Sequence, residues 1–307
     1  MNSNKLIIIT GPTATGKTAL AVRLATHFNG EIINVDSMQV YRRFDIGAAK
    51  PSPVELRAAP HHLIDICEPY DDYTAACFAR DAAIKVEEIR ARGRAVFVAG
   101  GTGLYIKALT CGLLSAPPAD NVLRSELAAM AQEFGKAAVH DRLKAVDPVA
   151  ASSIHPNNLR RVIRAIEVTT LLGCPVSQAQ GEHGFTDKPY RTLKLGIRVE
   201  RDVMYAAIDR RVDRMMNDGL VDEVRGIIAD YGTELKPMAG LGYKEVKGYL
   251  AGIHTLEEAV SLIKLNTRHY AKRQVTWFKK DSEIKWFPIE SKDVIIQEVE
   301  DFLKDCP

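Results

Sequence analysis

The chain has 307 residues, of which 46% are hydrophobic and 26% are charged, enough for one large domain or two smaller ones. The formal net charge is only +2, so the chain lacks the overall positive field of a general nucleic-acid binder, and any basic surface must be local. The five cysteines form no C-x-x-C pair, which argues against a zinc site or a disulfide framework and fits a reducing cytoplasm. No apolar stretch approaches the roughly 20 residues that span a bilayer, and the apolar run at the N-terminus is too short for a signal peptide.

The first predicted elements are a strand, a glycine-rich turn and a helix. Residues 6–10 form a continuous apolar run that predicts a buried strand. The sequence G-P-T-A-T-G-K-T follows, and residues 18–28 then carry apolar side chains at helical spacing. In this context G-x-x-x-x-G-K-[ST] is a phosphate-binding loop, in which the lysine supplies a mobile charge and the last hydroxyl a magnesium ligand. The predicted di- or triphosphate site consists of Gly11, Pro12, Thr13, Ala14, Thr15, Gly16, Lys17 and Thr18.

Two more predicted strands end at polar or glycine-rich turns. Residues 31–35 end at Asp36, and residues 95–99 end at G-G-T-G, which contains Thr102. Strands that alternate with helices predict an α/β fold with a P-loop NTPase-like parallel sheet core. Ligands bind such sheets at the carboxyl ends of the strands. We therefore expect Gly11, Asp36 and Thr102 to converge on one site.

The pattern alone does not assign roles to these polar residues. Asp36 could hold magnesium through water, accept a proton from a nucleophile, or cap a helix. Thr102 could bind phosphate or simply stand at the start of a helix. His61 and His62 are adjacent, and adjacent residues on a strand point to opposite faces, so we expect structural roles rather than a shared metal.

A change of pattern follows Leu114. The sequence A-P-P-A at residues 116–119 breaks the chain, and the pattern is helical from residue 122 to about 173, with Leu123, Leu127, Met130 and Phe134 at steps of three and four. Residues 193–199 again predict a strand. We expect a core of residues 1–116 and 193–307 with a helical insertion domain of residues 117–192.

Three stretches are rich in arginine or lysine. Residues 159–170 predict a helix with three arginines on one face and no carboxylate among them, which suits either a solvated face or an anionic partner. Residues 266–280 mix basic and aromatic side chains, which suits phosphate contact and base stacking, or a helix with Trp277 and Phe278 buried and its cations outside. Arg211 lies in a third arginine-rich stretch, where an arginine could clamp a diphosphate, but spacing does not choose among them.

Taken together, these stretches resemble the tRNA dimethylallyltransferases, a family that prenylates the adenosine next to the anticodon. The matching motifs run in the family's order from residue 11 to 278: G-P-T-A-T-G-K-T, D-S-M-Q-V-Y, H-H-L-I-D, G-G-T-G-L-Y, R-R-V-I-R-A-I-E-V, G-L-V-D-E-V, G-Y-K-E and Y-A-K-R-Q-V-T-W-F. The combination of D-S-M-Q-V-Y with A-K-R-Q-x-T-W is far more specific than the phosphate-binding loop alone. One departure is Ala48, where the family usually has threonine, and we expect it to weaken one contact near the site.

The resemblance implies that the loop holds the diphosphate of dimethylallyl diphosphate, with magnesium on Thr18 and no nucleotide cofactor. It implies that the amides of residues 13–18, Lys17 and Arg211 neutralise the departing diphosphate. It also implies that Asp36 is the general base for the adenine amine, and that the Thr102 hydroxyl steadies the same region.

The implied partner is the anticodon stem-loop of tRNA, whose unpaired adenosine can leave its stack at little cost. The helical insertion would clamp this stem-loop, and a monomer in the cytoplasm, without a membrane partner, is the expected form. The residues expected to contact tRNA are Asp36, Ser37, Met38, Gln39, Thr102, Arg124, Arg160, Arg161, Val162, Ile163, Arg164, Arg268, Lys272 and Arg273.

Three other functions remain possible from the sequence. An adenylate isopentenyltransferase shares the fold and prenylates a free nucleotide, but it needs neither the helical insertion nor the long basic C-terminal segment. A small-molecule or nucleotide kinase would use ATP in the same loop. A tRNA-binding module without enzymatic activity would still bind stem-loops after loss of Asp36.

Overall fold

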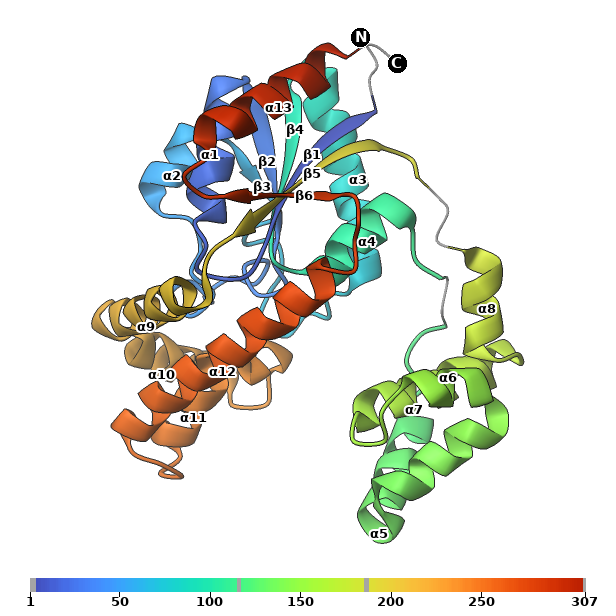
Figure 1. The fold of residues 1–307 in the computed structure, drawn as a ribbon. Coiled ribbons are helices and arrows are strands. Elements are labelled where there is room, and N and C mark those ends of the chain that lie inside the picture. Colours follow the sequence, from blue (N-terminus) through green and yellow to red (C-terminus); the bar gives the residue numbers. More distant parts are fainter. Residues whose placement is uncertain (1–3, 115–116, 185–187, 306–307) are drawn as a thin grey trace. The chain divides into compact units, whose positions relative to one another are not determined.

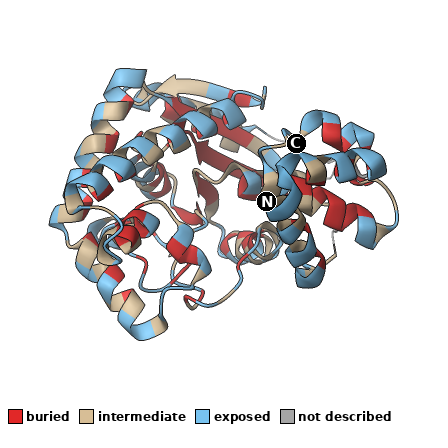
Figure 2. Ribbon diagram, turned by 90° about the horizontal axis from the view of Figure 1, so that it is seen from below, coloured by how far each residue is buried: buried red, intermediate tan, exposed pale blue. Residues whose placement is uncertain are grey.

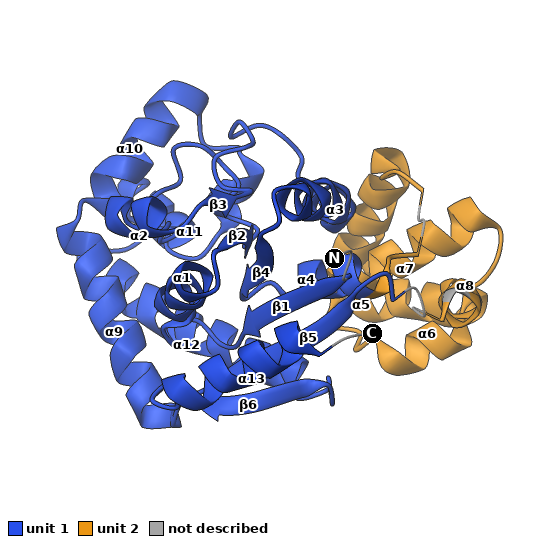
Figure 3. Cartoon of the chain, turned by 90° about the horizontal axis from the view of Figure 1, so that it is seen from above, with its two compact units in different colours: residues 1–110, 188–307 blue, residues 111–187 orange. Residues whose placement is uncertain are grey.

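The computed structural model describes residues 4–114, 117–184 and 188–305, which divide into two compact units. Unit 1 contains Met1–Thr110 and Lys188–Pro307, and unit 2 contains Cys111–Asp187 (Figure 3). The sequence analysis placed the two boundaries after residues 116 and 192, and residue 116 lies outside the described residues. Within the described ranges, no helix is long and apolar enough to cross a membrane.

Unit 1 is built on a six-stranded sheet with the order β3-β2-β4-β1-β5-β6 (Figure 1). Every neighbouring pair of strands is parallel, so the predicted parallel α/β sheet is confirmed. The strands are β1 Lys5–Thr10, β2 Gly30–Val35, β3 His61–His62, β4 Ala95–Gly100, β5 Arg191–Arg198 and β6 Ile284–Pro288.

Helices cover both faces of this sheet, because successive side chains of a strand point to opposite faces. On β1, Ile7 and Ile9 enter the core shared with α1 and α13, whereas Leu6 and Ile8 enter the larger core shared with α3, α4 and the helices between β5 and β6. Figure 2 shows the buried residues concentrated in the central strands and the helix faces that cover them. The helices of unit 1 are α1 Lys17–His27, α2 Pro53–Ala58, α3 Ala75–Ala91, α4 Gly103–Cys111, α9 Arg201–Asn217, α10 Leu220–Tyr231, α11 Tyr243–Leu250, α12 Leu256–Phe278 and α13 Lys292–Lys304, with a 3-10 turn at Lys236–Ala239.

Unit 2 consists of helices packed around an apolar core of their own. They are α5 Asn121–Val146, α6 Pro148–Ser153, α7 Leu159–Leu172 and α8 Val176–His183. Leu127, Val139 and Val162 are fully buried in this core. The prediction that Phe134 continues the apolar face of α5 is wrong: its side chain is 64% exposed. Gly135, with a φ of 82°, interrupts the helix directly after Phe134.

The histidine pair lies on β3 at the edge of the sheet. His62 Nε2 is 2.6 Å from Glu31 Oε2, and Glu31 also accepts hydrogen bonds from Arg92 at 2.7 and 2.9 Å. Glu31 is only 2% exposed, and its hydrogen bond with Arg92, helped by His62 and opposed by burial, lowers the pKa of its carboxyl from 4.5 to about 2. His62 therefore has the structural role predicted for it.

Glu31 should make the fold sensitive to acid. Because its pKa is lower in the folded chain, its ionised form stabilises the fold fully above pH 4.5 and loses this contribution as the pH falls toward 2. The shift corresponds to about 3 kcal/mol. Glu31→Gln should therefore lower the urea midpoint at pH 7 and flatten its dependence on pH between 5 and 3. An equally steep acid dependence in wild type and variant would contradict this assignment.

Candidate active site

The phosphate-binding loop connects β1 to α1 through three residues with positive φ: Gly11 at 140°, Ala14 at 63° and Gly16 at 81°. A Cβ atom on Gly11 would lie 2.7 Å from the backbone oxygen of Ile197 on β5. The loop can therefore pass this close to the neighbouring strand only with glycine at this position. The path places the first turn of α1, with its free amides, at the carboxyl edge of the sheet, where an anion would be stabilised.

Gln274 of α12 ties this loop to the second glycine-rich turn. The amide of Thr13 donates to Gln274 Oε1 at 2.9 Å, and Gln274 Nε2 donates to the carbonyl of Gly101 at 2.9 Å. Sequence reasoning used its motif to support the family resemblance but assigned Gln274 no role. The available signal was its helical position: Gln274 shares the buried face of α12 with Ala271 and Phe278. The amides open to an anion are therefore those of residues 14–18, because the Thr13 amide already has a partner.

An open cleft lies beside the loop, and all of its lining residues belong to unit 1. Lys17, Thr18, Asp36 and Arg211 all line it, although they come from α1, the end of β2 and α9. Thr102 lies next to the lining residues Gly100 and Gly101, and its side chain forms a hydrogen bond with Tyr270, another lining residue. The structure thus brings the predicted phosphate, base and clamp residues to one cleft.

The cleft carries two cations and one carboxylate at close range. Burial, with a smaller effect of Arg211, lowers the pKa of Lys17 from 10.5 to about 7, although Asp36 opposes this shift. Burial also lowers the pKa of Arg211. Burial raises the pKa of Asp36, against the lowering effects of two backbone amides and the two cations. Lys17 donates to the carbonyl of Pro12 in its own loop, so an incoming anion would replace a neutral partner with a charged one.

Asp36 uses one carboxylate oxygen to shape its own turn. Oδ1 accepts the amide of Met38 at 2.8 Å and the amide of Gln39 at 3.3 Å. Residues 37–40 form a turn and not a helix, so Asp36 closes a turn where a helix cap was one of the three roles open from sequence, and this contact occupies only Oδ1. Among the described residues Oδ2 has no hydrogen-bond partner, which leaves it to meet a substrate or a metal-bound water.

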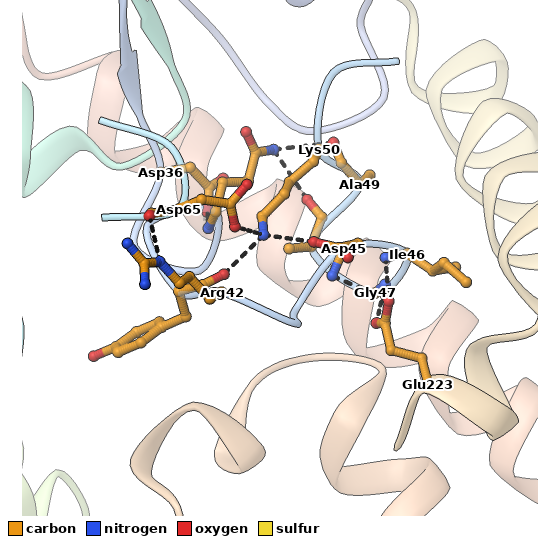
Figure 4. Close-up of polar contacts among 12 residues, drawn as sticks. Asp36, Arg42, Asp45, Ile46, Gly47, Ala49, Lys50, Asp65 and Glu223 are labelled. Carbon is orange, nitrogen blue, oxygen red and sulfur yellow. Dashed lines mark hydrogen bonds and ion pairs between the residues drawn. The ribbon is translucent and has the colours of Figure 1, made fainter. Parts of the chain in front are cut away.

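Ala48, where the family usually has threonine, lies in the turn formed by residues 45–50. The amide of Ala48 donates to the Tyr243 hydroxyl at 3.0 Å, and its carbonyl accepts a hydrogen bond from Gln39 Nε2 at 3.0 Å. Figure 4 shows the surrounding turn, with Lys50 donating to Asp45 and Asp65. Because these contacts of residue 48 come from its backbone, alanine retains them.

The cleft also offers a donor set that suits magnesium. No cluster of three or more His, Cys, Asp or Glu side chains that could hold a metal occurs in the described ranges. The Thr18 hydroxyl and the Asp36 carboxylate line the same cleft. Magnesium keeps several water ligands and takes few protein oxygens when substrate phosphates supply the rest. The Thr18 hydroxyl therefore fits a magnesium ion that binds together with a diphosphate.

The arginines predicted to contact tRNA in unit 2 divide into two pairs. Arg160 and Arg161 are exposed. Arg124 donates to Glu167 at 2.8 and 2.9 Å, and Arg164 donates to it at 2.5 Å. The prediction of an arginine face without a carboxylate is wrong, because Glu167 lies one turn after Arg164 and is fully buried.

Val162, also predicted to contact tRNA, has no accessible surface in the structure. Its side chain is fully buried in the core of unit 2, and the neighbouring Ile163 is half-buried and packs against the same core. An RNA could therefore touch part of Ile163 but not the Val162 side chain. Both side chains follow the apolar face of α7, as helical periodicity requires.

The basic C-terminal stretch is similarly divided. Lys272 and Arg273 are exposed, whereas Arg268 pairs with Asp209 at 2.5 Å and so joins α12 to α9. Of the two aromatic residues that one of the alternatives placed in the core, Phe278 is buried, whereas Trp277 is 39% exposed. Its indole fits against Gly103, where an added Cβ would lie 2.2 Å from Nε1.

Ser37, Met38 and Gln39 complete the set of residues predicted to contact tRNA. Ser37 is exposed, and Met38 is half-buried with its methyl group against Gly240. Gln39 is 8% exposed and lines the cleft together with Asp36.

Comparison with known proteins gives one consistent family. Residues 39–281 match the model of the IPP transferase family. The chain is 54% identical to tRNA dimethylallyltransferase 2 of Geotalea uraniireducens, over 92% of this chain and 91% of that one. It is similar to the solved tRNA isopentenylpyrophosphate transferase of Bacillus halodurans, with 42% identity, a TM-score of 0.72, and coverage of 98% and 96%. A solved eukaryotic dimethylallyltransferase acting on tRNA is 28% identical, with a TM-score of 0.85 and coverage of 99% and 81%.

The low pKa of Lys17 predicts that diphosphate binding takes up a proton. Below pH 7 the lysine is charged before binding, but above pH 7 it must be protonated when the anion arrives, so affinity should fall by up to about tenfold per pH unit. Calorimetry of inorganic diphosphate binding at pH 6 and 8.5, in buffers of different ionisation enthalpy, measures this uptake. The Lys17→Arg side chain stays charged at both pH values. Any proton uptake that this variant shows therefore comes from the ionisation of diphosphate itself. Equal proton uptake by wild type and this variant would contradict the prediction.

Proposed function

The chain belongs to the IPP transferase family, and from this premise we propose that it transfers the dimethylallyl group of dimethylallyl diphosphate to tRNA. The acceptor is the exocyclic amine of the adenosine on the 3′ side of the anticodon, and the second product is diphosphate. The observation that carries the proposal is the presence of Lys17, Arg211 and Asp36 around one cleft, in a chain so similar to tRNA dimethylallyltransferases. A diphosphate and a proton donor would both find their partners there.

The leaving diphosphate is held by the phosphate-binding loop. The amides of residues 14–18 and the side chains of Lys17 and Arg211 take the negative charge that builds as the bond between the allylic carbon and its oxygen breaks. Magnesium, held by Thr18 and the diphosphate, supplies further positive charge when it is bound. The diphosphate departs with the electron pair of the broken bond.

The amine is activated from the other side of the cleft. An exocyclic adenine amine is a poor nucleophile, because its lone pair is delocalised into the ring. Asp36 Oδ2 accepts one amine proton as the new nitrogen–carbon bond forms. The raised pKa of Asp36 makes it a stronger base than an ordinary carboxylate, and Thr102, held by Tyr270, lies beside it.

The tRNA is bound by exposed cations on both units. Arg160 and Arg161 in unit 2 and Lys272 and Arg273 in unit 1 are exposed and available to RNA phosphates. The helical unit acts as a clamp on the anticodon stem-loop. The enzyme works as a monomer in the cytoplasm.

Removal of Asp36 tests the reaction itself. Purified protein with magnesium, dimethylallyl diphosphate and an anticodon stem-loop carrying consecutive loop adenosines should add one five-carbon prenyl group, detected by mass spectrometry of the RNA. Asp36→Asn keeps an oxygen for the two amides but cannot accept the proton, so kcat should fall by a factor of about 10² to 10⁴. A wild-type product on free AMP instead of RNA would replace the proposal with a free-nucleotide transferase. ATP hydrolysis with no prenyl transfer would mean a kinase-like activity.

The two arginine pairs of unit 2 should respond differently to substitution. Arg160→Ala with Arg161→Ala should weaken stem-loop binding and reduce the slope of log K against log[salt] by up to about two, without changing the melting temperature. Arg124→Ala should instead lower the melting temperature, because it removes two hydrogen bonds from the buried Glu167. Fluorescence anisotropy at several salt concentrations measures the first effect, and calorimetry the second. Unchanged RNA affinity in the Arg160/Arg161 variant would contradict the clamp.

A further inference from the structure

Tyr270 of α12 contributes the one phenyl ring among the described residues that line the cleft. The other apolar residues that line it are small or almost completely buried. Ala49 has a single methyl group, and Ala21, Ile32 and Ala99 are at most 6% exposed. Tyr270 is only half-buried. An apolar group bound in the cleft would therefore make most of its apolar contact with this ring.

Helical spacing places Tyr270 between the phosphate-binding loop and Asp36. Gln274 lies four residues later on the same face of α12 and bonds to the Thr13 amide and the Gly101 carbonyl. Tyr270 lies one turn, about 5.4 Å, before it along the helix. Burial, with a smaller effect of the Asp36 carboxylate, raises the pKa of Tyr270 to about 12. Tyr270 thus has the loop on one side and Asp36 near enough on the other to affect its ionisation.

The Tyr270 side chain is held at its hydroxyl and on one face. The hydroxyl forms hydrogen bonds with the side chains of Thr102 and Gln274. The guanidinium of Arg273 lies over the ring, 5.8 Å from its centroid, which leaves the opposite face toward the cleft. Gln274 is 6% exposed and is fixed by its own bonds to two loops. The ring therefore cannot turn away from the cleft without breaking these contacts.

The group that the proposed reaction transfers consists of carbon and hydrogen alone. It must lie between its own diphosphate and the amine that attacks it. With the diphosphate on the phosphate-binding loop and the amine at Asp36, this position coincides with that of Tyr270. A hydrocarbon gains free energy there in proportion to the apolar area that it buries.

We propose that the ring of Tyr270 packs against the dimethylallyl group and limits the prenyl donor to five carbons. This inference rests on the proposed function, because it assumes a diphosphate on the loop and an acceptor at Asp36. Tyr270 is then a specificity-determining residue. A ten-carbon geranyl group would have to displace the ring and break its hydrogen bonds with Thr102 and Gln274.

The test compares donor analogues that share one diphosphate and differ only in their hydrocarbon. They are the methyl, dimethylallyl and geranyl thiolodiphosphates, in which sulfur replaces the bridging oxygen. Calorimetry measures each affinity with magnesium and a stem-loop that carries purine riboside, which has no amine to react. Wild type should bind the dimethylallyl analogue about tenfold more tightly than the methyl one, and the geranyl analogue at least about tenfold more weakly than the dimethylallyl one.

Tyr270→Ala should reduce the dimethylallyl-to-methyl ratio to about two or less and bring the geranyl affinity to that of the dimethylallyl analogue. Tyr270→Phe keeps the ring but frees it from Thr102 and Gln274, so it should keep the first ratio and lose part of the second. His269→Ala is the matched control, since His269 is the preceding residue of α12, is exposed and should leave both ratios unchanged. The affinity for inorganic diphosphate reports whether each variant keeps a folded loop.

Three results would overturn the inference: both ratios retained by Tyr270→Ala, a loss of affinity for inorganic diphosphate as large as that for the dimethylallyl analogue, or a first ratio lost as fully in Tyr270→Phe as in Tyr270→Ala. The proposed function is tested separately by prenyl transfer. A wild type that selects the five-carbon analogue through Tyr270, yet transfers no prenyl group to RNA, would support the inference and refute the function. A wild type that transfers the group but binds all three analogues equally would refute the inference alone.

Discussion

The two hydrogen bonds of Gln274 join the parts on which the cleft depends. One holds the phosphate-binding loop through Thr13, and the other holds the second glycine-rich turn through Gly101. Each loop follows a different strand. Both are rich in small residues, whose side chains make too few contacts to hold the backbone in one conformation. A single buried amide with one acceptor and one donor can satisfy both loops at once. The C-terminal helix α12 therefore contributes to a phosphate site formed near the start of the chain.

The charges of the cleft suit a reaction in which one reactant needs positive charge nearby and the other needs a base. A leaving diphosphate needs positive charge, whereas an amine that loses a proton needs a base. Lys17 and Arg211 serve the first and Asp36 the second, and Asp36 opposes the lowering of both cations' pKa values. Without a bound diphosphate, the positive charges of Lys17 and Arg211 repel each other within the cleft. The resting cleft thus favours an anion before anything else binds.

Local sequence patterns predicted the sheet, the loop and the strand ends well, because these depend on period and on short motifs. The four predicted strands occur within a few residues of their expected bounds, and Lys17, Asp36 and Arg211 do line one cleft. The errors arose where a remote partner decides the outcome. Glu167 could not be recognised as the partner of Arg124, which is 43 residues away. Nor could a single helical period reveal the break at Gly135 or the exposure of Trp277.

Three of the motifs that lie far from the phosphate-binding loop in the sequence share one structural role. Glu223 and Tyr243 lie in G-L-V-D-E-V and G-Y-K-E, and Gln274 lies in A-K-R-Q-V-T-W. All three side chains bond to backbone groups of loops that border the cleft. Backbone groups present the same donors and acceptors whatever the side chains are, so a carboxylate, a phenol or an amide at the right distance can set the path of a loop. This is also why alanine at position 48 is compatible with the site: its backbone makes the required contacts. The specificity of the cleft would then depend on side chains that never touch the substrate as much as on those that do.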